Sequence, residues 1–332
     1  MRTKIVSFGS YAPPKVVKNS DLEQLMETSD EWIQTRSGIK ERRWVEPGET
    51  CTGMALKASR QALDRAGLVP DDLDAIIYAC LISDYVFPGG GVQLQHALGG
   101  KRLIPALDVR NQCSGFLYSL SIADAWIRSG FYKRVLIVGS EIHSTSLDKS
   151  TRGRDIAVLF GDAASACIVE ACPDNEKSQV LETILASEGQ YAEKLAVLKP
   201  SASDHPRIGD RQDLTKGYYP QMDGKHVFKN AVQRMTEATM ELLKRQGLKA
   251  SDLDFVIAHQ ANYRIISMVM EQLALPATKT HYTLDRFGNT TAATIPLTMD
   301  EAVQTGKVKR GDLVLFTAFG AGFTWGSTLL RY

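Results

Sequence analysis

Residues 63–77 read LDRAGLVPDDLDAII, and residues 243–257 read LKRQGLKASDLDFVI. The two stretches lie 180 residues apart, and eight of their positions carry the same residue in register. Each copy shows the pattern of a helix that ends at a glycine, a short loop and a buried strand. The chain therefore contains an internal duplication, which predicts two halves of similar fold.

A second pair of segments supports the duplication. GFYKR at residues 130–134 precedes an apolar strand-like run, and GKVKR at residues 306–310 precedes another. Helices that alternate with apolar strands in both halves predict α/β layers around buried, mostly parallel sheets. The more polar segment 173–216 is interpreted as the join between the halves together with a surface excursion.

The composition is that of an ordinary soluble globular protein. The 332 residues are 44% hydrophobic and 23% charged, and the net charge of +1 gives no reason to expect binding to nucleic acid or to a membrane. No apolar run approaches the roughly 20 residues that span a bilayer, and the N-terminus enters a strand-like run directly. The five cysteines form no C-x-x-C pair, and the six histidines show no metal-ligand spacing. We therefore expect a cytoplasmic protein with free thiols and no metal.

Cys113 lies between residues 103–109, whose apolar run predicts a buried strand, and a stretch with helical spacing of apolar residues, 114–127. A thiol at such a junction is close to the positive end of the helix dipole and to unpaired backbone N–H groups. Both favour the thiolate, the reactive form of cysteine. The alternative is a small buried residue that fills a tight junction, and this feature alone does not decide between the two.

Polar residues at strand ends and turns indicate a ligand site. His259 occupies the strand end that carries Ala79 in the first repeat, and α/β sheets bind ligands at such carboxyl ends. Asn289 follows Gly288 in a predicted tight turn, and small residues at 319–326 let backbone N–H groups approach a bound oxygen. A structural histidine and an ordinary Gly-Asn turn are the alternatives.

The order cysteine, histidine, asparagine along the chain also describes papain-like cysteine proteases. The residues around Cys113 lack the C-G-[SA]-C-[WY] pattern of those enzymes. A protease also gives no reason for the duplication or for the two glycine-rich turns. A cysteine hydrolase therefore remains a remote alternative.

A set of motifs closely resembles the β-ketoacyl-acyl carrier protein synthase III family of the thiolase superfamily, over essentially the whole chain. The motifs are Thr28-Ser29-Asp30-Glu31-Trp32-Ile33, Arg36-Ser37-Gly38-Ile39, Arg152-Gly153 with Phe160-Gly161-Asp162, His259-Gln260-Ala261-Asn262, Asp285-Arg286-Phe287-Gly288-Asn289-Thr290 and the run from Phe319 to Gly326. The resemblance implies a homodimer and a five-layer αβαβα fold of two pseudo-symmetric halves. These are residues 1–175, with the nucleophilic cysteine, and residues 176–332, with the histidine and asparagine.

The resemblance also implies the chemistry. Cys113, His259 and Asn289 would form a catalytic triad, and the backbone N–H groups of Cys113 and Ala321 would hold an oxyanion. An acyl-CoA would acylate Cys113. A malonyl thioester, on acyl carrier protein or on coenzyme A, would then lose carbon dioxide and attack the acyl group. The product is a β-ketoacyl thioester for fatty acid biosynthesis, and the reaction needs no cofactor.

The substrate contacts of the family map onto further residues of this sequence. Trp32 and Arg152 would sandwich the adenine of coenzyme A, with Arg36 near a phosphate and Thr28 in the same binding motif. Phe87 would lie near the acyl pocket at the dimer interface. Lys229 and Arg264 would belong to a basic surface that docks the acidic carrier protein.

Several residues depart from the housekeeping pattern of the family. Gln112 precedes the nucleophile where small residues are usual, Ala321 replaces a glycine, and Lys225 replaces an asparagine of the coenzyme channel. Gly89-Gly90-Gly91 is also atypical. A glutamine before the cysteine, with Ser-Gly after it, is similar to the quinolone-signal synthase branch. A specialised secondary-metabolite or signal-molecule ketosynthase or acyltransferase is therefore the second hypothesis, and a non-catalytic partner of the carrier protein is the third.

Overall fold

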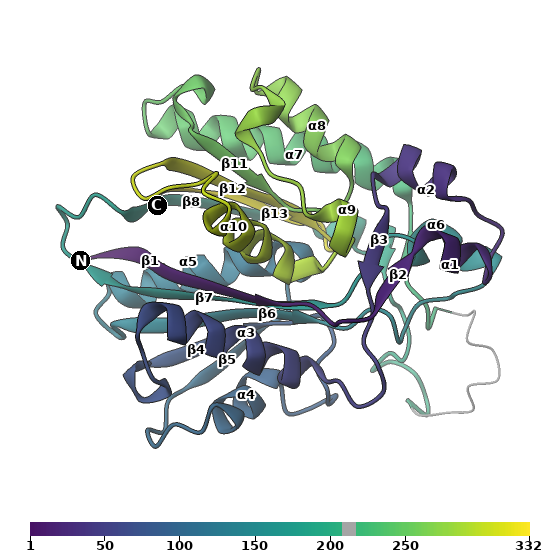
Figure 1. Ribbon diagram of the computed structural model, residues 1–332, viewed down its shortest axis with the longest axis horizontal. Coiled ribbons are helices and arrows are strands. Elements are labelled where there is room, and N and C mark those ends of the chain that lie inside the picture. Colours follow the sequence, from purple (N-terminus) through teal and green to yellow (C-terminus); the bar gives the residue numbers. More distant parts are fainter. Residues whose placement is uncertain (208–216) are drawn as a thin grey trace.

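The computed structural model describes residues 1–207 and 217–332, and two β-sheets form its frame (Figure 1). The first sheet has the strand order β1-β7-β6-β4-β5, and the second has the order β11-β12-β13-β8. Their strands are β1 (Arg2–Tyr11), β4 (Ala75–Ala79), β5 (Ala106–Val109), β6 (Arg134–Glu141), β7 (Ala163–Cys172), β8 (Gln179–Ser187), β11 (Phe255–Ala258), β12 (Leu313–Gly320) and β13 (Thr324–Arg331). Side chains on both faces of β4, β6 and β12 are buried, because helices cover each sheet from two sides.

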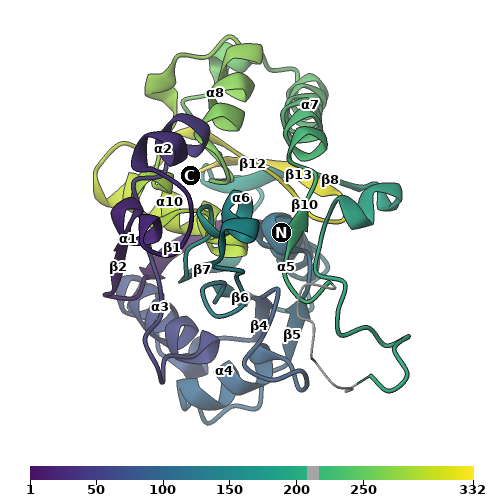
Figure 2. The same cartoon turned by 90° about the vertical axis from the view of Figure 1, so that its right-hand side faces the viewer.

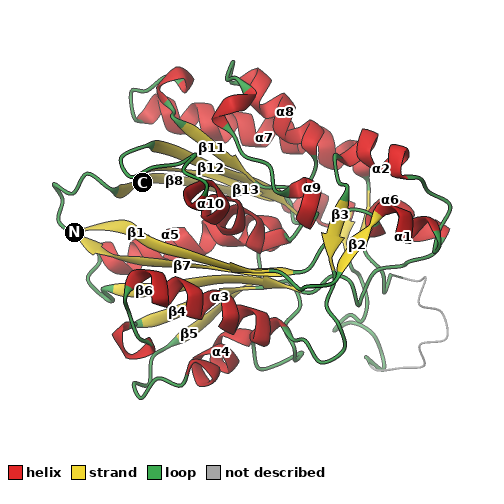
Figure 3. Ribbon diagram, viewed as in Figure 1, coloured by secondary structure: helices red, strands yellow, loops and turns green. Residues whose placement is uncertain are grey.

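Helices form three layers around the two sheets, so that the order of layers is αβαβα (Figure 3). One helix pair covers the outer face of each sheet, and a third pair lies between the sheets. From the first sheet outward to the second, the pairs are α3 (Cys51–Ala66) with α4 (Gly90–Leu98), α5 (Gly115–Arg128) with α10 (Thr294–Gln304), and α7 (Gly224–Arg245) with α8 (Tyr263–Gln272).

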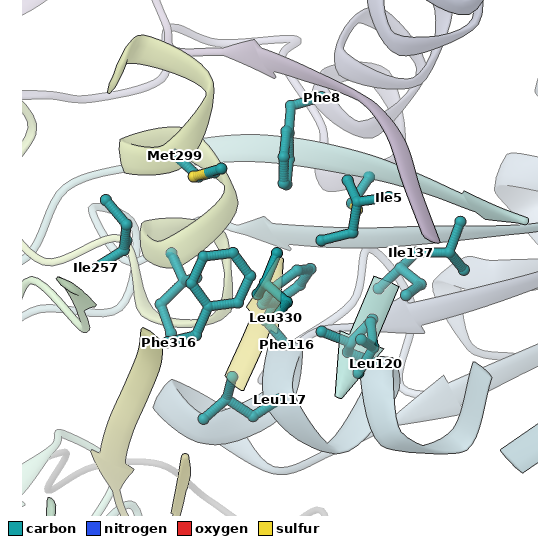
Figure 4. Close-up of a cluster of buried hydrophobic side chains, with 14 of the residues drawn as sticks. Ile5, Phe8, Phe116, Leu117, Leu120, Ile137, Ile257, Met299, Phe316 and Leu330 are labelled. Carbon is teal, nitrogen blue, oxygen red and sulfur yellow. The ribbon is translucent and has the colours of Figure 1, made fainter. Parts of the chain in front are cut away.

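The central layer packs against both sheets and joins the two halves in one core (Figure 4). Phe116 of α5 and Phe316 of β12 meet edge to face, with ring centroids 5.9 Å apart. Leu120 of α5 and Met299 of α10 are buried in the same cluster. Each such side chain stabilises the fold by about 1.5–3 kcal/mol through burial. This packing fixes α5, and with it Cys113 at the start of the helix.

The internal duplication is confirmed by the strand order of the two sheets. β1, β7, β6 and β4 of the first sheet correspond in order to β8, β13, β12 and β11 of the second. Within the part of the chain that the structure describes, β5 has no counterpart. The repeated segments end α3 and α7 and lead into β4 and β11, as the sequence predicts. The fold is therefore the expected five-layer architecture of two similar halves.

The sheets are mixed, as expected, but they are not mostly parallel. Three neighbouring strand pairs of the two sheets are parallel and four are antiparallel. β12 and β13 are joined by a three-residue turn, and a short turn can pair strands only in the antiparallel sense. The prediction from alternating helices and strands overlooked these direct connections.

Two further expectations about single segments are wrong. Residues 103–109 do not form a buried strand: β5 is an edge strand, with Leu103 96% and Leu107 38% exposed. Segment 173–216 is more than a join, because it contains β8, which belongs to the second sheet. Residues 208–216 of that segment lie outside the described residues. Apolar runs alone do not reveal whether a strand has neighbours on both sides.

A group of small elements lies at one end of the sheets, on the right of Figure 1 and towards the viewer in Figure 2. Arg42 is fully buried among them and donates to the carbonyl oxygens of Val17 and Val158, at 3.2 and 2.8 Å. The elements are β2 (Val16–Lys18), α1 (Asn19–Glu23), α2 (Asp30–Ser37), β3 (Glu41–Arg43), α6 (Arg154–Ala157), β9 (Leu195–Ala196), β10 (Gln221–Met222) and α9 (Leu284–Phe287).

Gly9 of β1 marks a close approach of a strand to a helix. A Cβ at this position would lie 2.3 Å from the carbonyl oxygen of Ala58 and 2.6 Å from the amide nitrogen of Ala62, both in α3. Gly9→Ala is therefore expected to lower the free energy of unfolding by about 1–3 kcal/mol, because the backbone of α3 must move. Urea unfolding measures this, with Gly189→Ala as the control, since no atom lies within 4 Å of a Cβ there. Equal stability of the two variants would contradict the prediction.

Candidate active site

Cys113 lies where a short 3-10 turn, η2 (Gln112–Ser114), continues into α5, and its side chain is buried. The turn is tight, because Gln112 has a φ of +41°, in the left-handed region that residues with a side chain seldom adopt. Gly320, at the end of β12, packs so closely that a Cβ there would lie 2.7 Å from the Cβ of Cys113. The glycine-rich segment therefore lets the second half of the chain reach the thiol.

Burial controls the protonation of the Cys113 thiol. Burial, with a smaller contribution from the Glu141 carboxyl, raises the pKa of Cys113 to about 12, against the opposing effect of its own backbone N–H and the Asn289 side chain. Burial also raises the pKa of Glu141, to about 8. The backbone N–H favours the thiolate, as expected from the helix terminus, but desolvation outweighs it and the pKa of Cys113 stays high.

His259 directly follows β11, and its ring is buried. Nδ1 lies 2.6 Å from Oγ1 of Thr294, and Nε2 has no hydrogen-bond partner among the residues described. Burial lowers the pKa of His259 to about 3, so the ring is neutral at pH 7. The Thr294 hydroxyl donates to the carbonyl oxygen of Thr291 at 2.7 Å, so Nδ1 donates to that hydroxyl and Nε2 accepts. If the Thr294 hydroxyl turns and donates to Nδ1 instead, Nδ1 becomes the acceptor and Nε2 carries the proton and can donate.

Asn289 follows α9, and the predicted tight turn at Gly288 connects the two. Gly288 has a φ of +65°, and a Cβ there would lie 2.8 Å from the carbonyl oxygen of Leu159. The backbone N–H of Asn289 donates to that same oxygen at 2.8 Å, so the glycine permits a close approach of two backbones. The Asn289 side chain is buried and contacts Cys113, whose pKa it lowers.

Cys113, His259 and Asn289 line one cavity of 510 Å³, although they lie far apart in the sequence. The three side chains are buried, whereas Arg36 and Arg264, which line the same cavity, are exposed. The cavity therefore leads from the protein surface to the three residues. This arrangement can hold a long ligand with its reactive end at the thiol.

Trp32 of α2 lines the exposed end of the cavity and lies close to two cations. The Arg36 guanidinium is 4.3 Å from the centre of its ring, and the Arg154 guanidinium is 5.1 Å from it. The resemblance implies Arg152 at this ring, whereas the cation that covers it from this segment is Arg154. No local pattern of the sequence links Arg154 to Trp32, so sequence reasoning missed it.

Two further cations line the exposed end from the second half of the chain. The Arg264 guanidinium of α8 lies 5.5 Å from the centre of the Phe228 ring, and Lys225 is the second residue of α7. Among the described residues of the lining, Asp155 is the one carboxylate. The entrance therefore carries a net positive charge, which suits a ligand with phosphate groups.

Five residues that the resemblance assigns do not line this cavity. Phe87 is 83% exposed on the loop before α4, and Lys229 lines a separate groove between α7 and α8. Arg152 is held in an ion pair within its own turn. Thr28 and Ala321 are half-buried outside the lining. The roles assigned to these five stay predictions.

Residues 1–207 and 217–332 contain no cluster of three or more histidine, cysteine, aspartate or glutamate side chains that could hold a metal ion. None of the helices in these two ranges is both long and apolar enough to pass through a membrane.

Comparison with known proteins decides the family. The family described as 3-oxoacyl-[acyl-carrier-protein (ACP)] synthase III matches residues 107–189, and the description of its C-terminal part matches residues 243–332. The β-ketoacyl-[acyl-carrier-protein] synthase III of Salmonella arizonae is 42% identical over 332 residues, which cover all of both chains. The chain belongs to the β-ketoacyl-[acyl-carrier-protein] synthase III family.

Solved structures of β-ketoacyl-[acyl-carrier-protein] synthase III proteins share the fold. The protein of Aquifex aeolicus is 43% identical, with a TM-score of 0.89 over 99% of this chain and 100% of its own. The protein of Pseudomonas aeruginosa is 33% identical, with a TM-score of 0.90 over 100% and 98%. The priming β-ketosynthase from the R1128 polyketide biosynthetic pathway is 32% identical, with a TM-score of 0.89 over 99% and 96%. The predicted family, fold and class of enzyme, a condensing acyltransferase, are confirmed.

Proposed function

We propose that this synthase condenses an acyl-CoA with a malonyl thioester through an acyl-Cys113 intermediate, and so supplies a β-ketoacyl thioester for fatty acid biosynthesis. The observation that carries the proposal is the convergence of Cys113, His259 and Asn289 at the buried end of one cavity. The family membership supports condensation over hydrolysis. The cytoplasm is the proposed setting, and the chemistry uses side chains and backbone groups of the chain without a cofactor.

Acylation is the first step. The Cys113 sulfur attacks the thioester carbonyl of the acyl-CoA, and the backbone N–H groups of Cys113 and Ala321 stabilise the oxyanion. The bond to the coenzyme A sulfur breaks, and the thiol proton of Cys113 passes to that leaving sulfur. Burial raises the pKa of Cys113 and so favours the neutral thiol, which supports loss of the proton together with attack by the sulfur.

Condensation is the second step. The malonyl thioester carbonyl takes the place between His259 and Asn289, where Nε2–H and the amide NH2 group donate to it. Carbon dioxide leaves, and the electron pair of the broken bond forms an enolate that these two donors stabilise. The enolate carbon attacks the acyl carbonyl, the bond to the Cys113 sulfur breaks, and the sulfur takes up a proton from water. Donation by His259 requires the Thr294 hydroxyl to turn towards Nδ1.

The proposed function is tested by intact-mass measurement of the wild-type protein. Incubation with a panel of acyl-CoAs is expected to add one acyl group to the protein. A malonyl thioester should then remove that group, with release of carbon dioxide and a β-ketoacyl product. Running the second step with malonyl-CoA and with malonyl-acyl carrier protein identifies the donor. Release of free acid without any malonyl thioester would contradict the proposal and favour a hydrolase.

Trp32 is proposed to bind the adenine of coenzyme A, with Arg36 and Arg154 near its phosphates. Trp32→Ala is expected to raise KM for an acyl-CoA about 10-fold, because stacking and cation–π contacts of this kind contribute about 1 kcal/mol or more. KM for the corresponding acyl-pantetheine, which has no adenine, should not change. Steady-state kinetics with both substrates checks this, and an equal rise in both KM values would contradict the adenine contact.

Exposed apolar side chains around the edge strand β5 favour a homodimer. Leu107 of β5 and the nearby Phe87 are both exposed, and an unpaired edge strand readily pairs with a second copy. In such a dimer, Phe87 reaches the acyl pocket of the partner. Sedimentation velocity is expected to give a dimer of chains of 36.6 kDa each. Leu107→Glu is expected to give the monomer, and a dimer that persists would place the interface elsewhere.

The carrier-protein surface is proposed at α7 and α8. Lys229 and Arg264 are exposed there: Arg264 lies over the ring of Phe228, and Lys229 lines the groove between the two helices. Their positive charge complements an acidic carrier protein, and attraction of this kind speeds association at low salt.

A specialised ketosynthase is the second candidate function, because of the residues beside the nucleophile. Gln112 adopts its left-handed backbone where the housekeeping pattern has a small residue, and Ala321 adds a methyl group next to Gly320. The similarity to the R1128 priming β-ketosynthase supports the same candidate. Malonyl decarboxylation without extension of any simple acyl-CoA would favour it over the housekeeping role.

A further inference from the structure

The loop that carries Asn289 is strained at Thr291, which has a φ of +54°. A β-branched residue rarely adopts this left-handed backbone, because its side chain crowds the neighbouring peptide group. Such strain persists only where the surroundings hold it, and it concentrates at functional sites. The contacts of Thr291 therefore show what holds the loop in place.

Thr291 is clamped through its side chain. Its Oγ1 lies 2.5 Å from Nε2 of His143, a buried histidine just after β6. His143 is itself fixed: its backbone N–H donates to Asp162 at 2.7 Å, and its ring centre lies 4.6 Å from that of Phe160. The clamp joins the first half of the chain to the second.

The clamped residue in turn orients Asn289. The backbone N–H of Thr291 donates to Oδ1 of Asn289 at 2.9 Å. With the amide oxygen held there, the NH2 group is directed to Cys113, which the Asn289 side chain contacts. The donor that the malonyl step needs is therefore aimed by the backbone of Thr291.

We infer that His143 and Thr291 are positioning residues that hold Asn289 for the malonyl step, an inference that rests on the proposed function. A misplacement of about 1 Å in a reacting group can slow a step about 10²-fold. Acyl transfer to Cys113 relies on backbone N–H groups rather than on the Asn289 amide. Loss of the clamp should therefore slow the malonyl step and leave acyl transfer to Cys113 unchanged.

Two variants break the clamp from opposite sides. Thr291→Val removes the hydroxyl and keeps the branched Cβ, and His143→Phe removes the other partner of the same hydrogen bond. Each is expected to slow carbon dioxide release from a malonyl thioester about 10-fold or more, while acyl uptake by Cys113 stays within about 2-fold of wild type. Thr291→Ser keeps the hydroxyl and should restore carbon dioxide release. Thr239→Val is the matched control: its buried hydroxyl bonds to Ser327 at 3.1 Å outside the cavity, and neither step should change.

Separate measurement of acyl uptake and of carbon dioxide release distinguishes a positioning role of the two residues from a purely structural one. Equal loss of both steps in Thr291→Val and His143→Phe would overturn the inference, and so would no loss in either step. A variant that does not fold loses both steps and counts against it. The proposed function fails in a different way: the wild-type protein itself would then take up no acyl group or release no carbon dioxide.

Discussion

Cys113→Ala is expected to take up no acyl group from any acyl-CoA and to lose condensation activity by a factor on the order of 10⁴–10⁶. The sulfur forms the covalent bond that carries the acyl group, and the methyl group of alanine cannot replace it. Intact-mass measurement after incubation with acyl-CoA reads the uptake directly. Cys167→Ala is the matched control, because this cysteine is fully buried in the central core and should leave acylation unchanged.

An acyl adduct on the Cys113→Ala protein would place the nucleophile elsewhere. The pH dependence of the wild-type thiol gives a second check. Because the pKa of Cys113 is raised to about 12, the thiolate fraction grows about tenfold per pH unit below that value. Alkylation of Cys113 by iodoacetamide should therefore accelerate steadily from pH 6 to pH 10. A plateau near pH 8 would show that the thiol ionises more readily than its burial implies.

His259→Ala is expected to keep acyl transfer to Cys113 and to slow condensation about 10²–10³-fold. The neutral His259 ring contributes one of the two hydrogen-bond donors to the enolate oxygen. Alanine removes this donor, so the negative charge of the enolate is less stabilised. The acyl-enzyme should accumulate in this variant, and intact-mass measurement together with carbon dioxide release records both effects. His281→Gln is the matched control, since this buried histidine pairs with Glu301 at 2.7 Å and does not line the cavity.

Loss of acylation in His259→Ala, to the same extent as loss of condensation, would assign His259 a different role. The ring would then act as the base that activates Cys113, as in a cysteine hydrolase. The contacts of His259 argue against this, since burial keeps its pKa near 3 and so disfavours an imidazolium beside the thiolate.

Local patterns of the sequence predicted two duplicated α/β halves, and together with the family resemblance they singled out the three residues that meet in the cavity. The duplication places His259 at the end of a strand that corresponds to β4, and the Gly288 turn marks Asn289. Each of these signals depends on residues close together in the chain. The same patterns misassigned residues 103–109 as a buried strand, because the edge position of β5 depends on which strands lie beside it.

The sequence by itself determined the two similar halves, the helix that begins after Cys113 and the family of the chain. Hydrophobic periodicity and turn chemistry act over a few residues, so they can be seen without the fold. Only the tertiary structure decided that desolvation raises the pKa of Cys113, that Arg154 covers Trp32, and that His143 clamps Thr291. Burial and contacts between distant segments arise when the layers pack together, and no local pattern carries them.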